Sequence, residues 1–172
     1  EVDFCRLFER LRHSKAELVG ITDSHDHGYH FQSFFLAAKD EGVNCLIRFL
    51  ENVVMLEAKS DVILAYEVRL RHIFRSHGLR CEVLFPSPIG FVQNSTIYRW
   101  DELLYEGFPF IKTVVLQALD RDEWLVFAEK SGYPLQVIDI SLEMLGGTWS
   151  ELVSTDVLTM PPDKREDIVR VR

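Results

Sequence analysis

The chain has 172 residues, of which 47% are hydrophobic and 27% charged, and its formal net charge is −8 at pH 7. This length and composition are typical of a globular domain that buries a full core. The acidic balance argues against a nucleic-acid partner, because such proteins usually present a basic face. No apolar run approaches the roughly 20 residues that cross a bilayer, and no signal-peptide pattern opens the sequence.

The cysteines and the ends of the sequence bear on localisation and domain organisation. Three cysteines without a C-x-x-C spacing predict buried thiols in a reducing cytoplasm rather than disulfides or a zinc site. The sequence begins inside a predicted helix without an initiator methionine, so we expect a piece of a longer protein. Residues 151–172 are polar and contain Pro161-Pro162, which predicts a tail or linker after one domain over residues 1–150.

Hydrophobic spacing predicts the elements of the first half of the chain. Phe4, Leu7, Phe8 and Leu11 recur at helical spacing and predict a helix over residues 3–13. The elements expected after it are strands over 17–22 and 31–38, a helix over 40–56, a helix from an N-cap at Ser60 to about His77, and a strand over 80–85.

The second half is expected to be mostly helical after a turn-rich loop at residues 86–90. The elements expected there are a short strand over 96–99, a short helix from Asp101, and helices over 108–117, over 120–131 with Asp120 as its cap and Gly132 as its stop, and near 140–146. Strands that alternate with helices predict the α/β class, with a mixed sheet flanked by helices.

The loop between the first two predicted strands carries five titratable residues, which are Asp23, His25, Asp26, His27 and His30. Loops at strand ends carry much of protein chemistry, although a solvated polar turn explains the composition equally well. Imidazole and carboxylate groups also suit a transition metal, but ligands contiguous in one loop converge poorly.

Glu67 lies at the edge of the apolar arc of the helix predicted from Ser60. At about 100° per residue that arc contains Ile63, Tyr66, Leu70, Ile73 and Phe74. A carboxylate at the edge of a buried stripe can line a cleft and act as a base. The alternative is an ordinary surface ion pair between Glu67 and Arg71, four residues on.

Two sets of residues carry a resemblance to glycosyltransferases. Positions 66–79 resemble the E-D-x-D-L-x-x-R-L-x-x-x-G helix of inverting family-2 enzymes, with Glu67 at an acidic position, Gly78 at the final glycine and Val68 in place of the second acid. Four ordered blocks resemble the rhamnan synthesis protein F family of bacterial polysaccharide glycosyltransferases. These are Gly20–Ser24, His30–Leu36, Asp61 with Tyr66-Glu67, and Asn94–Thr96 with Trp100 followed by Pro109–Lys112. Within them Phe34 replaces the usual tyrosine and Ser95 a frequent proline.

The resemblance implies part of a GT-A-like fold that transfers a sugar, rhamnose above all, from a donor such as dTDP-rhamnose to a growing polysaccharide. It implies Glu67 as the base with Asp23 as second choice, and His30, Gln32 and Ser33 as contacts to a sugar. Magnesium or manganese would neutralise the leaving diphosphate, with Asp23 and Asp26 as candidate ligands.

Two further residues of the family blocks have competing interpretations. Trp100 would stack on a sugar ring or pack in a core, and Lys112 would meet a phosphate or lie along the surface. Asp23-Ser24-His25-Asp26 does not have D-x-D spacing, and the nucleotide-binding half of a family enzyme lies upstream of these blocks, so the chain resembles the acceptor-side half of such an enzyme.

The sequence leaves three functions open. The first is a glycosyltransferase domain of cell-surface polysaccharide or lipopolysaccharide synthesis, cytoplasmic or at the inner face of the plasma membrane, with a glycan or lipid-linked acceptor. The second is a non-catalytic module that binds glycans or proteins, and the third is a metal hydrolase using the Asp/His loop. A homodimer, or the remainder of a longer chain, would cover an apolar edge left by a missing half.

Overall fold

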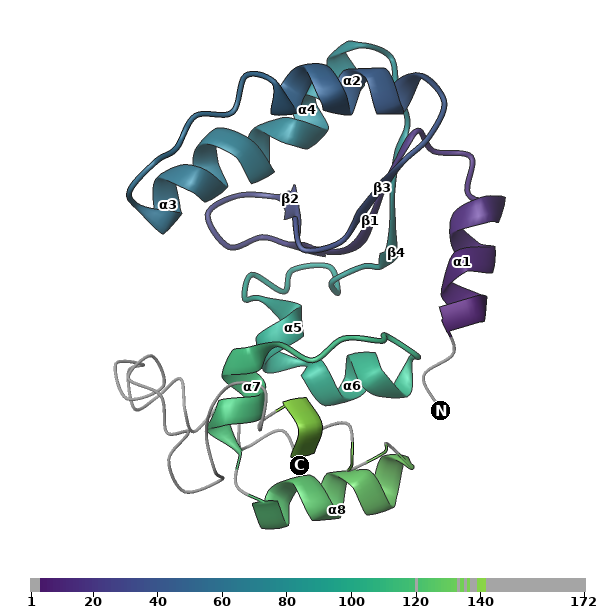
Figure 1. Cartoon of the computed structure of the whole chain (residues 1–172), viewed down its shortest axis with the longest axis vertical. Helices are drawn as coiled ribbons and strands as arrows, with labels where there is room; N and C mark the ends of the chain where they lie inside the picture. Colours follow the sequence, from purple (N-terminus) through teal and green to yellow (C-terminus); the bar gives the residue numbers. More distant parts are fainter. Residues whose placement is uncertain (1–3, 120, 133, 135, 137–138, 142–172) are drawn as a thin grey trace. The chain divides into compact units, whose positions relative to one another are not determined.

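The computed structural model describes residues 4–119, 121–132, 134, 136 and 139–141. The chain divides into two compact units, one from Phe4 to Ser95 and one from Thr96 onward. The first unit carries all the strands found in the described residues, and the second is helical (Figure 1). The predicted cap Asp120, most of the helix predicted near residues 140–146 and the tail over 151–172 lie outside the described residues.

The first unit is a mixed α/β fold, as the sequence predicts. Its elements are α1 (Phe4–His13), β1 (Leu18–Ser24), β2 (His30–Phe31), β3 (Leu36–Ala38), α2 (Glu41–Leu50), α3 (Lys59–Val62), the π-helix η1 (Ile63–Glu67), α4 (Val68–Ser76) and β4 (Cys81–Phe85). The predicted N-cap at Ser60 is wrong, because the helix begins at Lys59 after Ala58. Gly78 does end this helix, with a φ of 75° that favours glycine.

The sheet is built around β1, which is buried along its whole length. β4 pairs with β1 in parallel from Leu18 to Thr22, whereas β2 and β3 pair with it antiparallel. Parallel and antiparallel pairing in one four-stranded sheet makes the sheet mixed. The C-terminal end of β1 therefore meets the segment that follows β4, which brings Asp23 to Ser87.

The strand predicted over residues 31–38 is interrupted. Gly20 pairs with Leu36, and Asp23 pairs with Phe31. The two pairs are three residues apart on β1 but five residues apart on the opposite segment. The two extra residues form a bulge around Ser33 and Phe34, which are exposed. Simple alternation would have put His30, Gln32 and Phe34 on one face, and the bulge breaks it after Gln32.

Helices α2 and α4 cover one face of the sheet (Figure 1). The core between them contains Leu18, Phe31, Leu70 and Phe74, with α2 contributing the partly buried Leu46 and Phe49. The start of α2 lies directly on the chain before β1, because a Cβ added to Gly42 would come within 2.2 Å of the Glu17 carbonyl oxygen. Close approach of this kind needs glycine.

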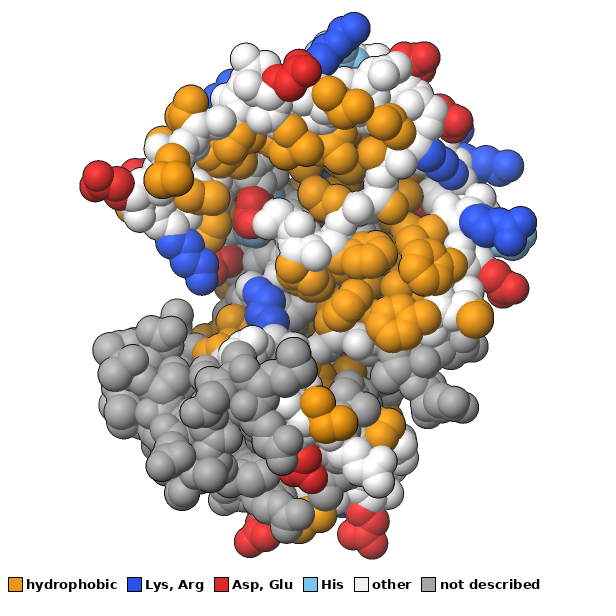
Figure 2. Space-filling model, viewed as in Figure 1, with side chains coloured by type: hydrophobic (Ala, Val, Ile, Leu, Met, Phe, Trp, Pro, Cys, Tyr) orange, Lys and Arg blue, Asp and Glu red, His pale blue; other side chains and the backbone are white. Residues whose placement is uncertain are grey.

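The outer side of α2 remains apolar and exposed. Val43, Ile47 and Leu50 are 41%, 49% and 56% exposed, and Figure 2 shows hydrophobic side chains gathered over this part of the first unit. All three cysteines are free, but none is fully buried as expected: Cys5 is exposed, and Cys45 and Cys81 are partly buried.

The second unit contains α5 (Ser95–Tyr98), α6 (Trp100–Tyr105), α7 (Thr113–Ala118) and α8 (Arg121–Ser131), although Ser95 itself belongs to the first unit. The predicted strand over 96–99 is wrong, since these residues begin with a helical turn. The helix predicted over 108–117 begins only at Thr113. Trp100, Val115, Trp124 and Phe127 form the core of this unit. In the described part of the chain, no helix has the length and apolarity that crossing a membrane requires.

Candidate active site

Glu67 meets residues of the β2 segment at the end of the sheet. Its Oε1 accepts a hydrogen bond from Ser33 Oγ, and its Oε2 lies 3.4 Å from His30 Nε2. Ser33 occupies the bulge and Glu67 ends the π-helical turn, so two local irregularities aim the two side chains at one another. Both kinds of irregularity are frequent at functional sites.

The buried His30 side chain fixes the position of the Glu67 carboxylate. It is 5% exposed, and its Nδ1 lies 2.7 Å from the Gly28 carbonyl oxygen. A carbonyl only accepts hydrogen bonds, so Nδ1 carries a proton and the acceptor nitrogen of a neutral ring is Nε2. Nε2 therefore faces Glu67 Oε2 across 3.4 Å.

Solvent reaches the cluster from one side. Ser33 is exposed, and the Glu67 side chain retains 20% of its accessible surface. The predicted Glu67–Arg71 ion pair does not form, because the Arg71 guanidinium lies 4.7 Å from the centroid of the Tyr29 ring. A hydroxyl group that approaches Ser33 from solvent would therefore meet a carboxylate oriented by His30.

Asp23 lies in the interior next to this cluster. It is 4% exposed, and its Oδ1 accepts a hydrogen bond of 2.6 Å from the backbone N–H of Ser87. Burial, followed by the charge of Asp23 and a hydrogen bond to it, raises the pKa of Tyr29 to about 12. Asp23 thus joins the C-terminal end of β1 to the segment after β4.

Gln32 connects the cluster to a third segment. It is buried, and its Nε2 donates to Asn94 Oδ1 at 2.8 Å and, more weakly, to the Asp23 carbonyl at 3.4 Å. Close by, the hydroxyls of Ser87 and Ser95 are hydrogen-bonded at 2.7 Å. Residues from all four family blocks thus meet at one end of the sheet.

The structure separates the remaining predicted residues. Asp26 is exposed, with its nearest ion-pair partner His27 at 3.7 Å, whereas Asp23 is buried against Ser87. Among the described residues, no group of three His, Cys, Asp or Glu side chains converges as metal ligands. Asp23 and Asp26 have different surroundings, and their role as metal ligands stays a prediction.

Trp100 and Lys112 belong to the second unit. Trp100 is 6% exposed and packs on Trp124 and Phe127, with ring centroids 5.1 and 4.7 Å away. Of its two interpretations, packing in a core is therefore the one that the structure supports, rather than stacking on a sugar ring. Lys112 is partly buried and directly precedes α7.

Four residues of the site were not among the predicted site residues: Tyr29, Arg71, Ser87 and Asn94. Asn94 belongs to a family block, and this membership is the sequence feature that could have indicated it as a site residue. Ser87 lies in a turn-rich loop, and its role depends on the parallel pairing of β1 with β4, which local sequence does not reveal. The sequence indicates Arg71 only as an alternative ion-pair partner of Glu67.

The sequence matches the family described as rhamnan synthesis protein F over residues 2–144. The chain belongs to this family, whose name places it among proteins of polysaccharide synthesis. Two curated relatives from Vibrio anguillarum, both named virulence protein VirA, are each 29% identical over 147 residues, covering 66% of this chain and 47% of the relative. The chain thus spans about half the length of these relatives. No solved structure gives a significant match.

Proposed function

We propose that the chain is part of a glycosyltransferase that moves a sugar, rhamnose in the first instance, from a nucleoside-diphosphate donor to a growing polysaccharide. The observation that carries the proposal is the Glu67 carboxylate, held by His30 and Ser33 at an accessible end of the sheet. Membership in the rhamnan synthesis protein F family supports the substrate class.

In the proposed reaction Glu67 is the general base. The acceptor hydroxyl oxygen forms a bond to the anomeric carbon while the bond from that carbon to the diphosphate breaks, and the nucleoside diphosphate leaves with the electron pair. The hydroxyl proton passes to Glu67 Oε2, where His30 Nε2 shares it across 3.4 Å. His30 is a positioning residue, and Ser33 Oγ orients the other carboxylate oxygen.

The proposal extends to the partners of the site. The donor is dTDP-rhamnose and the acceptor is a glycan or lipid-linked glycan, handled in the cytoplasm at the inner face of the membrane. Gln32, Asp23 and Asn94 support the wall of the site rather than meet solvent, since Gln32 and Asp23 are each 4% exposed.

A second candidate is a non-catalytic module that binds glycans. Both Glu67 oxygens already have protein partners, so the cluster would then serve only to fix the bulge against the helix. Because the match covers only about half of each relative, the catalytic residues of a longer protein would then lie in another part of it.

Calorimetric titrations of the full-length protein separate the two candidates. The glycosyltransferase is expected to bind dTDP-rhamnose in the presence of Mn²⁺ and also rhamnose oligomers. Binding of the oligomers alone would favour the module, and binding of neither would contradict both.

A further inference from the structure

The loop between β4 and α5, residues 86–94, presents apolar side chains to solvent at its tip. Ile89 is fully exposed and Val92 is 69% exposed. We propose that this loop docks on a lipid bilayer by inserting Ile89 and Val92 between the lipid headgroups. The inference rests on the proposed function, because it names the surface on which the Glu67 site would meet a lipid-linked acceptor.

The neck of the loop is closed and is anchored to the end of the sheet. The hydroxyls of Ser87 and Ser95 are hydrogen-bonded at 2.7 Å across the neck. The Ser87 N–H donates to Asp23 Oδ1 at 2.6 Å, and at the other end of the loop Asn94 accepts from the buried Gln32 at 2.8 Å. Compact loops whose ends lie close together are frequently functional. A neck fixed in this way lets the tip dock with little further loss of conformational entropy.

The tip itself is a hydrogen-bonded turn with Ile89 at its apex. The Phe91 N–H donates to the Pro88 carbonyl at 3.0 Å, and Gly90 has a φ of 84°, as the third position of a type II turn requires. Ile89 occupies the second position of this turn, and its side chain projects into solvent. Pro88 has no N–H to desolvate and the Phe91 N–H is already paired, which lowers the free-energy cost of moving the turn into apolar surroundings.

The charge distribution also suits a bilayer. No charged residue occurs between Glu82 and Arg99, in a chain of which 27% is charged, and charged side chains are the most costly groups to bring into lipid. Residues 4–95 contain as many Lys and Arg as Asp and Glu residues. The unit that carries the loop therefore has no net charge to oppose its approach to an anionic lipid surface.

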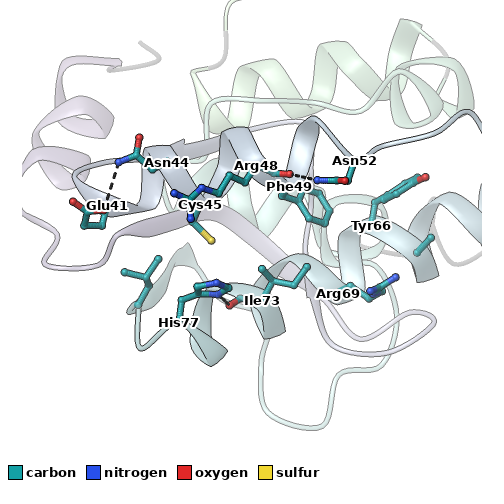
Figure 3. Close-up of a pocket in the computed structure, with 12 residues that line it drawn as sticks. Glu41, Asn44, Cys45, Arg48, Phe49, Asn52, Tyr66, Arg69, Ile73 and His77 are labelled. Atoms are coloured by element: carbon teal, nitrogen blue, oxygen red, sulfur yellow. Dashed lines mark hydrogen bonds between the residues drawn. The ribbon is translucent and has the colours of Figure 1, made fainter.

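Two other apolar regions of the first unit include charged side chains. The exposed apolar residues of α2 are interspersed with Glu41, Arg48 and Glu51. Figure 3 shows the groove of about 450 Å³ between α2 and the helix formed by η1 and α4, with Arg48 and Arg69 among the side chains that line it. Inserting either region into lipid would desolvate these charges, so the uncharged loop is the better docking element.

A protein partner fits the tip less well than a bilayer does. A specific protein interface buries about 800 Å² on each partner, whereas this tip presents two aliphatic side chains on a narrow turn. The binding energy of protein interfaces is concentrated in Trp, Tyr and Arg, and none of these occurs in residues 86–94. A few aliphatic side chains instead give the weak, reversible attachment that is typical of peripheral membrane proteins.

The test is co-sedimentation of the complete chain with vesicles of phosphatidylethanolamine and phosphatidylglycerol. The chain is expected to bind, and raising NaCl from about 0.1 to about 0.5 M should change the partition coefficient less than about twofold, since salt screens charges rather than apolar contacts. The loop variant, Ile89→Ser with Val92→Ser, is expected to bind at least about tenfold more weakly, because several methylene groups no longer leave water. The matched control, Val54→Ser with Met55→Ser, removes two exposed apolar side chains between α2 and α3 and should bind like the parent.

The docking is overturned if the parent does not bind the vesicles, if high salt abolishes binding, or if the loop variant, with unchanged circular dichroism, binds no more weakly than the control. Sugar transfer to a water-soluble rhamnose oligomer separates this outcome from the proposed function. The loop variant should keep the parent's turnover there, because neither substituted side chain belongs to the Glu67 cluster. A parent that binds vesicles through the loop but transfers no sugar would support the docking and contradict the proposed function.

Discussion

Glu67 is the residue on which the proposed site depends, because each of its oxygens has its own partner. Ser33 donates to Oε1, and His30 Nε2 lies 3.4 Å from Oε2. Neither contact is local in sequence. The helix and the family blocks were sufficient to single out Glu67, but its partners required the fold.

The proton on His30 is the first testable consequence. Because Nδ1 faces the Gly28 carbonyl at 2.7 Å, the neutral ring is expected to carry its proton on Nδ1. Nitrogen-15 NMR of the side chain should show a protonated Nδ1 at every pH at which the protein is folded. The exposed His72 serves as a reference for an ordinary ring, and a His30 ring protonated only on Nε2 would contradict the proposed geometry.

The elements that place the site depart from regular structure where it is formed. The bulge at Ser33 and the π-helical turn Ile63–Glu67 both insert residues that hydrophobic periodicity cannot locate. The periodic parts, such as α1, β1, β4 and the end of α4 at Gly78, follow the sequence pattern closely. The strand expected at 96–99 failed because the chain there begins a helical turn, with Ser95 hydrogen-bonded back to Ser87.

The join between β1 and β4 carries a pH-dependent prediction. Two hydrogen bonds from the Arg80 side chain and one from its backbone N–H lower the pKa of Glu17 from an ordinary value of 4.5 to about 2. A lowered pKa stabilises the folded state above pH 4.5, and this contribution is lost as the pH falls toward 2. Arg80→Gln should therefore lower the urea midpoint at pH 7 more than at pH 3.

The control for this experiment is Arg75→Gln, which removes an exposed arginine of α4 that forms no ion pair with a carboxylate among the described residues. Its effect on the urea midpoint should be small and similar at both pH values. An effect of Arg80→Gln that is equal at pH 7 and pH 3 would show that the ion pair does not contribute to stability.

At the scale of the whole molecule, each unit has its own hydrophobic core. The sheet, α2, α4 and the candidate site all lie between Phe4 and Ser95. The sequence predicted the α/β class and the strands that became β1 and β4. It did not predict the division near residue 95, because no linker composition marks it.

This division predicts that residues 4–95 fold alone. The excised segment contains no tryptophan, so its unfolding would be followed by circular dichroism. A single cooperative urea transition is expected, since the segment keeps its complete sheet and core. A gradual loss of signal without a transition would show that the segment depends on the rest of the chain.

The most direct test of the proposed function is sugar transfer by Glu67→Gln in the full-length protein, with dTDP-rhamnose as donor, a rhamnose oligomer as acceptor and product detected by mass spectrometry. Loss of the base is expected to lower turnover by about 10²–10⁴-fold, while the unfolding midpoint stays near that of the parent. Glu57→Gln, at an exposed position between α2 and α3, should keep full activity. Unchanged turnover in a folded Glu67→Gln variant would contradict the account.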